Sequence, residues 1–133
     1  MSAGRSLWRD RGAAAVEFAL VLPVLLLIIF GIIDFGRMLY TKITLTQAAQ
    51  AAARAGAILG PSSGQAEGQT AASGLNGGVT VVVTACADST DNPKNATATV
   101  TYHFDFVTPL AALADLDPDG VTLTSTGYSP CIG

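Results

Sequence analysis

Charged side chains are scarce in this 133-residue chain, where they make up 13% of the residues against roughly 25% in soluble domains. Histidine and cysteine are scarcer still: there is one histidine and there are two cysteines, without the ligand spacing of a zinc site. The sequence therefore predicts no cofactor and no bound metal of that kind.

The few charges are divided unevenly. Residues 1–12 carry a net charge of +2 and the remainder −5, which together give −3. Nucleic-acid binding depends on Lys and Arg side chains that neutralise phosphates. The acidic main part of the chain thus argues against nucleic acid as a partner.

The scarcity of charge is most pronounced in one long apolar run, residues 13–33. In residues 13–33 Glu17 is the one ionisable residue. As a helix, these 21 residues would cover about 31 Å, enough for a bilayer core of about 30 Å. We therefore expect a transmembrane helix over residues 13–35, surrounded by membrane lipid. The run is longer than the apolar region of a secretory signal peptide.

Basic residues precede this run. Arg5, Arg9 and Arg11 outnumber the single acid Asp10, which by the positive-inside bias places the N-terminus in the cytoplasm. Residues 1–12 are then a cytoplasmic basic leader, and residues 36–133 form an extracytoplasmic domain.

Glu17 needs its own explanation, because a carboxylate at mid-bilayer costs up to about 3 kcal/mol. It would avoid this cost if it lay one turn inside the helix and reached the interface. Its setting suggests a second explanation: Gly12, four small or apolar residues, then Glu17 and Phe18. This pattern resembles the type IV prepilin signal. The resemblance implies that prepilin peptidase cuts between Gly12 and Ala13, and that Glu17 then pairs with the free amine of Ala13 in a neighbouring subunit.

The wider string RGAAAVEFALVLPVLLLIIFGIIDFGRMLY and the alanine-rich stretch after it, residues 11–56 together, resemble the TadE-like pseudopilins of tight-adherence pilus systems. The resemblance implies a minor pseudopilin that helps to assemble or initiate such a pilus and is not an enzyme. Its partners would be prepilin peptidase and other pilin and pseudopilin subunits, at the bacterial cytoplasmic membrane. Two alternatives stay open: an uncleaved, single-pass anchored module that binds an extracellular partner, and a pseudopilin of a secretion system.

Beyond the membrane run the helix is expected to continue to residue 59, where Gly60 and Pro61 end it. Pro23 is tolerated inside a membrane helix and predicts a gentle kink over residues 21–23. In the second half an apolar stripe with helical spacing should be covered by the sheet. It consists of Met38, Leu45, Ala48, Ala52, Ala55 and Leu59.

The remaining residues predict a small sheet. Residues 60–78 are rich in Gly, Ser and Gln and indicate a loop, with a short helix at 65–73 as the alternative. Alternating apolar and polar residues indicate strands at 79–86, 96–104 and 121–128. Residues 107–114 have room for two helical turns. The fold class is α+β: a long N-terminal helix packed on an antiparallel three-stranded sheet formed by residues 79–133.

The two cysteines fall at related places in this sheet. If the strands form a meander, the first and third end at the same edge, which brings Cys86 and Cys131 within bridging reach. Both lie in the outward part of the chain, where disulfides persist. We therefore predict a disulfide between them.

Two further motifs have simpler explanations. Residues 60–64, GPSSG, match a nucleophile-elbow pattern but follow a helix instead of a strand, so we predict no catalytic residue there. Asp115, Asp117, Asp119 and Gly120 resemble the start of a calcium loop, but Thr126 stands where a bidentate Glu belongs. An acidic turn before a strand explains them more simply.

Overall fold

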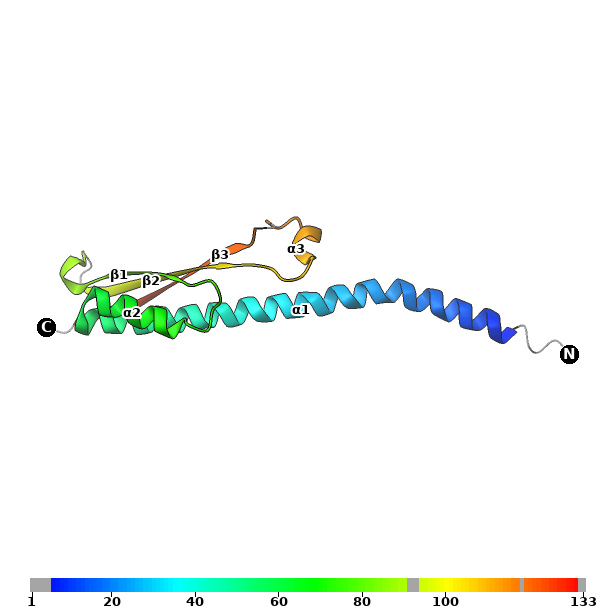
Figure 1. Ribbon diagram of the computed structural model, residues 1–133, viewed down its shortest axis with the longest axis horizontal. Coiled ribbons are helices and arrows are strands. Elements are labelled where there is room, and N and C mark those ends of the chain that lie inside the picture. The colour runs from blue at the N-terminus through cyan, green and yellow to red at the C-terminus, as the bar shows by residue number, and fades with distance from the viewer. Residues whose placement is uncertain (1–5, 91–93, 118, 132–133) are drawn as a thin grey trace.

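In the computed structural model the chain forms one long helix with a small sheet domain packed along its C-terminal half (Figure 1). The structure describes residues 6–90, 94–117 and 119–131, and side chains from residue 10 onward; Arg5 and the side chain of Arg9 lie outside this part. The α+β fold class is confirmed. The elements are α1 Ser6–Leu59, α2 Pro61–Ala71, β1 Thr80–Thr84, the 3-10 turn η1 Cys86–Asp88, β2 Asn95–Phe104, α3 Leu110–Leu113 and β3 Val121–Pro130.

Helix α1 has 54 residues, about 80 Å at 1.5 Å per residue. It ends at Leu59, as predicted, because Gly60 has a φ of 99° that favours glycine and Pro61 cannot continue the same helix. At the other end it begins at Ser6, so the helix runs through residues that we expected to precede it. Pro23 lies inside it, and Figure 1 shows the blue N-terminal part of α1 bending gently away from the rest.

The three strands form an antiparallel meander in the order β1-β2-β3. Val81 pairs with Val100, and Val100 pairs with Ser125. The inward side chains of β1 and β2 are those that the alternation predicted; Val81, Ala98 and Val100, for example, are buried. The outward rows are largely threonine, such as Thr80, Thr101 and Thr124. The sheet thus has one covered and one exposed face.

Helix α2 corrects the prediction for residues 60–78, where we expected a loop or a helix over 65–73. Pro61 is the first helical residue of α2, a position where its fixed φ is favourable and its missing N–H costs nothing. Gly64 and Gly68 made this stretch look like a loop, yet both are buried against other elements. A Cβ on Gly64 would lie 2.7 Å from the backbone oxygen of Ala52, so glycine permits the close contact between α2 and α1.

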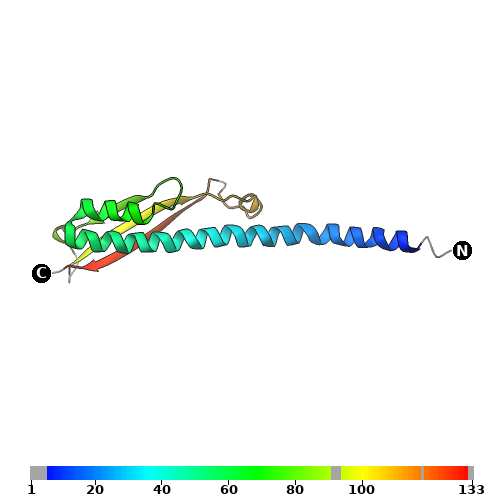
Figure 2. The ribbon, with the colours of Figure 1, turned by 60° about the horizontal axis from the view of Figure 1, so that its bottom comes forward.

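The buried face of α1 differs in part from the predicted stripe. Met38 and Ala55 are half-buried and Leu59 is exposed. The prediction assumed that one element, the sheet, covers α1, but two elements pack against it. Helix α2 packs on one side, and β3 approaches Ala49 through Gly127 on the other. Figures 1 and 2 show α2 beside α1 and the strands crossing it obliquely. The fully buried side chains of this face are Leu45, Ala48, Ala49, Ala52 and Ala53.

The disulfide between Cys86 and Cys131 is present, with a Cα to Cα distance of 5.8 Å. Cys86 follows β1 after one residue, and Cys131 follows β3 directly. The backbone N–H of Cys131 also donates a hydrogen bond of 3.1 Å to the carbonyl oxygen of Lys94, just before β2. The bridge therefore ties the outer strands together at the end of the sheet far from the N-terminus.

Candidate functional site

The N-terminal half of α1 projects from the rest of the molecule (Figure 1). It is long and apolar enough to cross a membrane by length and composition, and its most apolar 18-residue window is 0% buried against the rest of the chain. A core helix of a soluble protein would be mostly covered. This exposed half contains every residue that the sequence assigned to processing and assembly.

Gly12 and Ala13, which flank the predicted cleavage point, are both exposed and lie within α1. A Cβ placed on Gly12 would meet nothing within 4 Å. The peptide bond between them is therefore sterically accessible, but it is part of a helix. A peptidase that needs an extended substrate would first have to unwind this turn, which Gly12 makes easier, since glycine lowers helix stability by about 1 kcal/mol relative to Ala.

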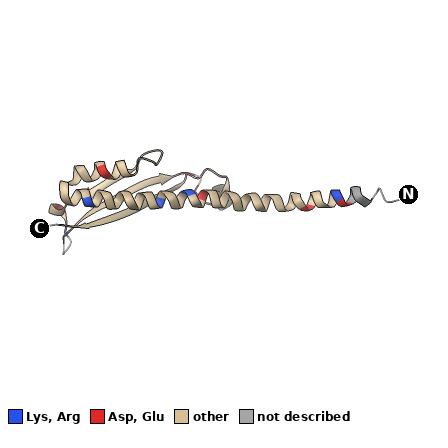
Figure 3. Ribbon diagram, turned by 90° about the horizontal axis from the view of Figure 1, so that it is seen from below, with Lys and Arg blue, Asp and Glu red and all other residues tan. Residues whose placement is uncertain are grey.

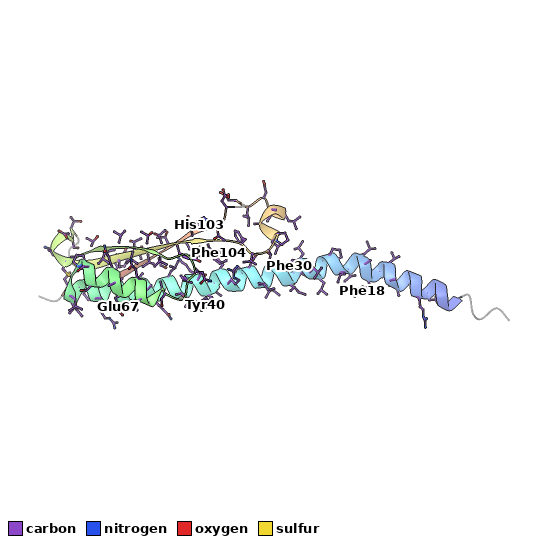
Figure 4. The ribbon with its side chains drawn as sticks, viewed as in Figure 1. Phe18, Phe30, Tyr40, Glu67, His103 and Phe104 are labelled. Atoms are coloured by element: carbon purple, nitrogen blue, oxygen red, sulfur yellow. A yellow bond between two sulfur atoms is a disulfide. The ribbon has the colours of Figure 1, made fainter. Side chains whose placement is uncertain are left out.

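Glu17 and Phe18 lie one turn further along the same helix and are both exposed. None of the described residues pairs with the Glu17 carboxylate. Figure 3 shows one acidic segment in the otherwise uncharged stretch of α1 that lies between its N-terminal charges and the charges beside the sheet domain. Figure 4 shows Phe18 on the part of the helix that no other element approaches. The Glu17 carboxylate is thus exposed on α1 and has no partner among the described residues.

Asp34, the next acid along α1, has the opposite environment. It is 5% exposed and accepts a hydrogen bond from the hydroxyl of Thr108 and one of 3.4 Å from the backbone N–H of Val107. Arg37 Nη1 lies 3.7 Å from its Oδ1. These contacts hold the connection between β2 and α3 against α1 at the C-terminal end of the apolar run.

Arg37 extends this contact to the end of β2. Its guanidinium carbon lies 5.2 Å from the centre of the Phe104 ring, a distance typical of a cation–π contact, and Nη1 donates a 3.5 Å hydrogen bond to the carbonyl oxygen of Asp105. We name Asp34, Arg37, Phe104 and Thr108 the junction cluster. Sequence reasoning missed it, because Val107 and Thr108, which donate hydrogen bonds to Asp34, are more than seventy residues away in the chain. The one signal was an acid directly after an apolar run.

The acidic turn adopts turn geometry. Asp117 Oδ1 accepts a 3.1 Å hydrogen bond from the backbone N–H of Asp119, while Asp115 and Gly120 have φ angles of 53° and 96°. Within the described ranges no three His, Cys, Asp or Glu side chains are grouped so that they could hold a metal ion. The Asp117 carboxylate thus bonds within the turn itself.

His103 lies on the exposed face of the sheet. Its Nε2 is 3.3 Å from Asp105 Oδ1 and also contacts the carbonyl oxygen of Asp119. The GPSSG stretch forms the start of α2, and Gly64 packs on Ala52. Neither feature brings a nucleophile to a base in the described structure.

One comparison with known proteins gives a match, and it falls on the projecting helix. Residues 12–54 match the family model described as TadE-like protein. The suspected resemblance to TadE-like pseudopilins is confirmed over this stretch, which is about a third of the chain. The match suggests a part in tight-adherence pilus systems, with other pilus subunits as partners. Neither a curated protein nor a solved structure gives a match.

The TadE-like match covers Gly12, Ala13, Glu17 and Phe18 and then follows α1 to Arg54. It therefore contains both the exposed apolar half of the helix and the half that is buried under α2 and the sheet. The sheet domain itself lies outside the matched residues. The similarity to TadE-like proteins is thus shown for the helix.

Proposed function

We propose that this chain is a minor pseudopilin that takes part in the assembly or initiation of a tight-adherence-type pilus. The observation that carries the proposal is the TadE-like match, which begins at Gly12 and includes an exposed Glu17 without a partner in the described chain. The apolar half of α1 anchors the precursor in the cytoplasmic membrane with its N-terminus in the cytoplasm, since Arg11 and its basic neighbours favour that side.

Processing after Gly12 changes the charge at the start of the helix. It removes the basic leader and leaves an ammonium group on Ala13, one helical turn from Glu17. In a filament the helices of neighbouring subunits lie side by side, and the ammonium of one subunit meets the Glu17 carboxylate of the next. In a low-dielectric environment this attraction is strong, and it marks the register between subunits.

The domain formed by residues 36–133 lies outside the cytoplasm. Its disulfide between Cys86 and Cys131 supports this placement, because disulfides persist in oxidising compartments. A domain of this size beside the helix is bulky for the shaft of a thin pilus, which favours a minor subunit at the tip or base. No catalytic role is proposed for it.

The cleavage test compares two glycines. Gly12→Val should leave the full-length chain in the membrane, whereas the unaltered chain should begin at Ala13 when coexpressed with prepilin peptidase. Gly36→Val is the matched control, because Gly36 is also an exposed helical glycine with nothing within 4 Å of its Cβ position. Mass spectrometry of the membrane fraction measures both. An unaltered chain that keeps Met1 or Ser2 would instead support the uncleaved, anchored binding module.

A further inference from the structure

The connection between β2 and β3 exposes large apolar side chains in an unusual place. Val107 is 70% exposed, Leu113 72% and Leu116 48%. We name these three residues the α3 patch, since Leu113 belongs to the short helix α3 and the other two lie before and after it. Side chains of this kind on a water-facing loop are a liability unless something covers them.

The α3 patch lies beside the outer end of the membrane-length run. Leu110 Cδ1 is 3.8 Å from the position that a Cβ would occupy on Gly31, and Gly31 is two residues from the last residue of the run, Ile33. An apolar hollow next to this contact is lined by Phe35, Phe106 and Leu116, among others. Figures 1 and 4 show α3 above this part of α1, well separated from α2.

Hydrogen bonds fix the position of the α3 patch along the axis of α1. The junction cluster attaches the loop to the helix on the side where α3 begins, through the bonds from Val107 and Thr108 to Asp34. At the other end, the N–H of Leu116 donates a 3.0 Å hydrogen bond to the carbonyl oxygen of Ala111 and closes the loop on itself. The patch therefore keeps its position relative to Gly31.

We propose that the α3 patch inserts into the outer leaflet of the membrane, so that the precursor holds the bilayer at two places: the apolar half of α1 and the α3 patch beside it. This inference rests on the membrane anchoring in the proposed function. If residues 13–33 span the bilayer, Gly31 lies roughly 3 Å inside the hydrocarbon boundary at 1.5 Å per residue. The α3 patch is then at the level where interfacial segments bury apolar side chains.

The surroundings of the α3 patch fit a lipid surface. The exposed Phe35 continues the apolar surface from α1 towards the α3 patch, so lipid that covers one also reaches the other. The carboxylates of Asp115, Asp117 and Asp119 are exposed and remain in the headgroup layer, where water reaches them. Their negative charge favours zwitterionic over anionic headgroups.

The test places one tryptophan at a time in the full-length chain. Trp8 is the only native tryptophan, so Trp8→Phe gives a background without indole emission. Leu113→Trp in this background probes the α3 patch. Leu25→Trp probes the middle of the apolar run, and Val82→Trp probes the outward face of the sheet, which is also exposed. Each variant is reconstituted in phosphatidylcholine vesicles, with and without brominated acyl chains.

We expect Leu113→Trp to emit at shorter wavelength than Val82→Trp and to lose most of its emission to bromines placed near the headgroups. Bromines deeper in the chains should quench it less and should quench Leu25→Trp more. Val82→Trp should be insensitive to both and accessible to iodide. If Leu113→Trp behaves like Val82→Trp while Leu25→Trp is quenched, the α3 patch stays in water and the inference is wrong, although the anchoring stands.

Two other outcomes also contradict the inference. If Leu25→Trp is not quenched either, the anchoring itself fails and the proposed function fails with it. If Leu113→Trp is shielded from iodide but not quenched by brominated lipid, and the shielding disappears at one chain per vesicle, then the α3 patch is covered by a second copy of this chain instead of lipid.

Discussion

The two halves of α1 are built from apolar residues of different size. In the N-terminal half the large side chains are mostly exposed, from 37% at Leu22 to 72% at Leu20. In the C-terminal half the buried positions are mainly alanine, and Ala48 and Ala52 are 0% exposed. One continuous helix thus presents a bulky surface to the outside and a smooth, small-residue surface to its own domain.

The difference in side-chain size suits each half of α1 to a different environment. Small residues gain stabilisation through close approach of backbones, as where Gly64 meets Ala52. Large residues exposed all round suit lipid first and neighbouring helices later. The junction cluster around Asp34 and Arg37 lies where one surface gives way to the other. Under the proposed function, assembly depends on the N-terminal half, whereas the buried alanines of the C-terminal half stabilise the domain.

The largest expected effect tests the N-terminal half. Glu17→Ala should leave membrane insertion and cleavage intact but reduce filament number by about tenfold or more, because removing one partner of a buried ion pair leaves the other charge uncompensated. Electron microscopy of filaments and N-terminal sequencing of the mature chain measure the two steps separately.

Glu67→Ala is the matched control for this experiment, since Glu67 is an exposed glutamate on α2 (Figure 4). It should assemble as the unaltered chain does. Equal loss of filaments in both variants would mean that assembly does not depend on the carboxylate in the apolar half, and the division between the two halves would be wrong in that respect.

The disulfide tests the opposite end of the molecule. The Cys86→Ser and Cys131→Ser double variant should lower the free energy of unfolding of the sheet domain by about 4 kcal/mol, the chain-entropy value for a loop of this length. The bridge spans a sequence separation of 45. Thermal unfolding with and without reductant measures the change. A thiol titration of the untreated protein that finds two free cysteines would contradict the pairing outright.

Overpacking the alanine-rich face of α1 should lower the free energy of unfolding less than loss of the disulfide does. Ala52→Leu adds three carbon atoms at a position that is 0% exposed and faces Gly68 of α2, and should destabilise the domain by about 1–3 kcal/mol. Ala66→Leu makes the same change at an exposed position of α2 and should stay within about 0.5 kcal/mol. Denaturant unfolding of both variants gives the two free energies of unfolding; similar values would show that position 52 tolerates a larger side chain and is not tightly covered.

Periodicity in the sequence predicted the elements whose pattern is local. Strict alternation in residues 96–104 located β2 to within one residue, and the meander it implied brought Cys86 to Cys131. These predictions succeeded because side-chain direction in a strand depends only on position along it.

Helix α2 and the junction cluster could not be predicted in this way. Gly64 and Gly68 lower helix propensity, and only the contact with α1 explains why they are there. Pro61 did carry a helix-start signal, which the glycine-rich composition outweighed. The role of Asp34 depends on Thr108, and nothing local in either stretch indicates that they meet.

The smallest expected effect concerns the boundary between the two halves. Thr108→Val removes the hydroxyl that donates to Asp34 but nearly preserves side-chain size. In this variant Asp34 still accepts the 3.4 Å hydrogen bond from the Val107 N–H and still lies 3.7 Å from Arg37. The free energy that holds the loop on α1 should therefore fall by only about 1 kcal/mol. Because the lost bond lies in the loop, the change should appear as local opening, with amide hydrogen exchange at Val107 about fivefold faster.

Thr126→Val is the control, because Thr126 lies on the outward face of β3 and is exposed. It should leave exchange at Val107 unchanged. If Thr108→Val instead lowers the stability of the whole domain as much as Ala52→Leu does, the junction cluster belongs to the cooperative core and the two halves of α1 are not energetically separate. If exchange changes only in residues 105–120, the cluster acts as a local attachment that holds the α3 patch at its height on the helix.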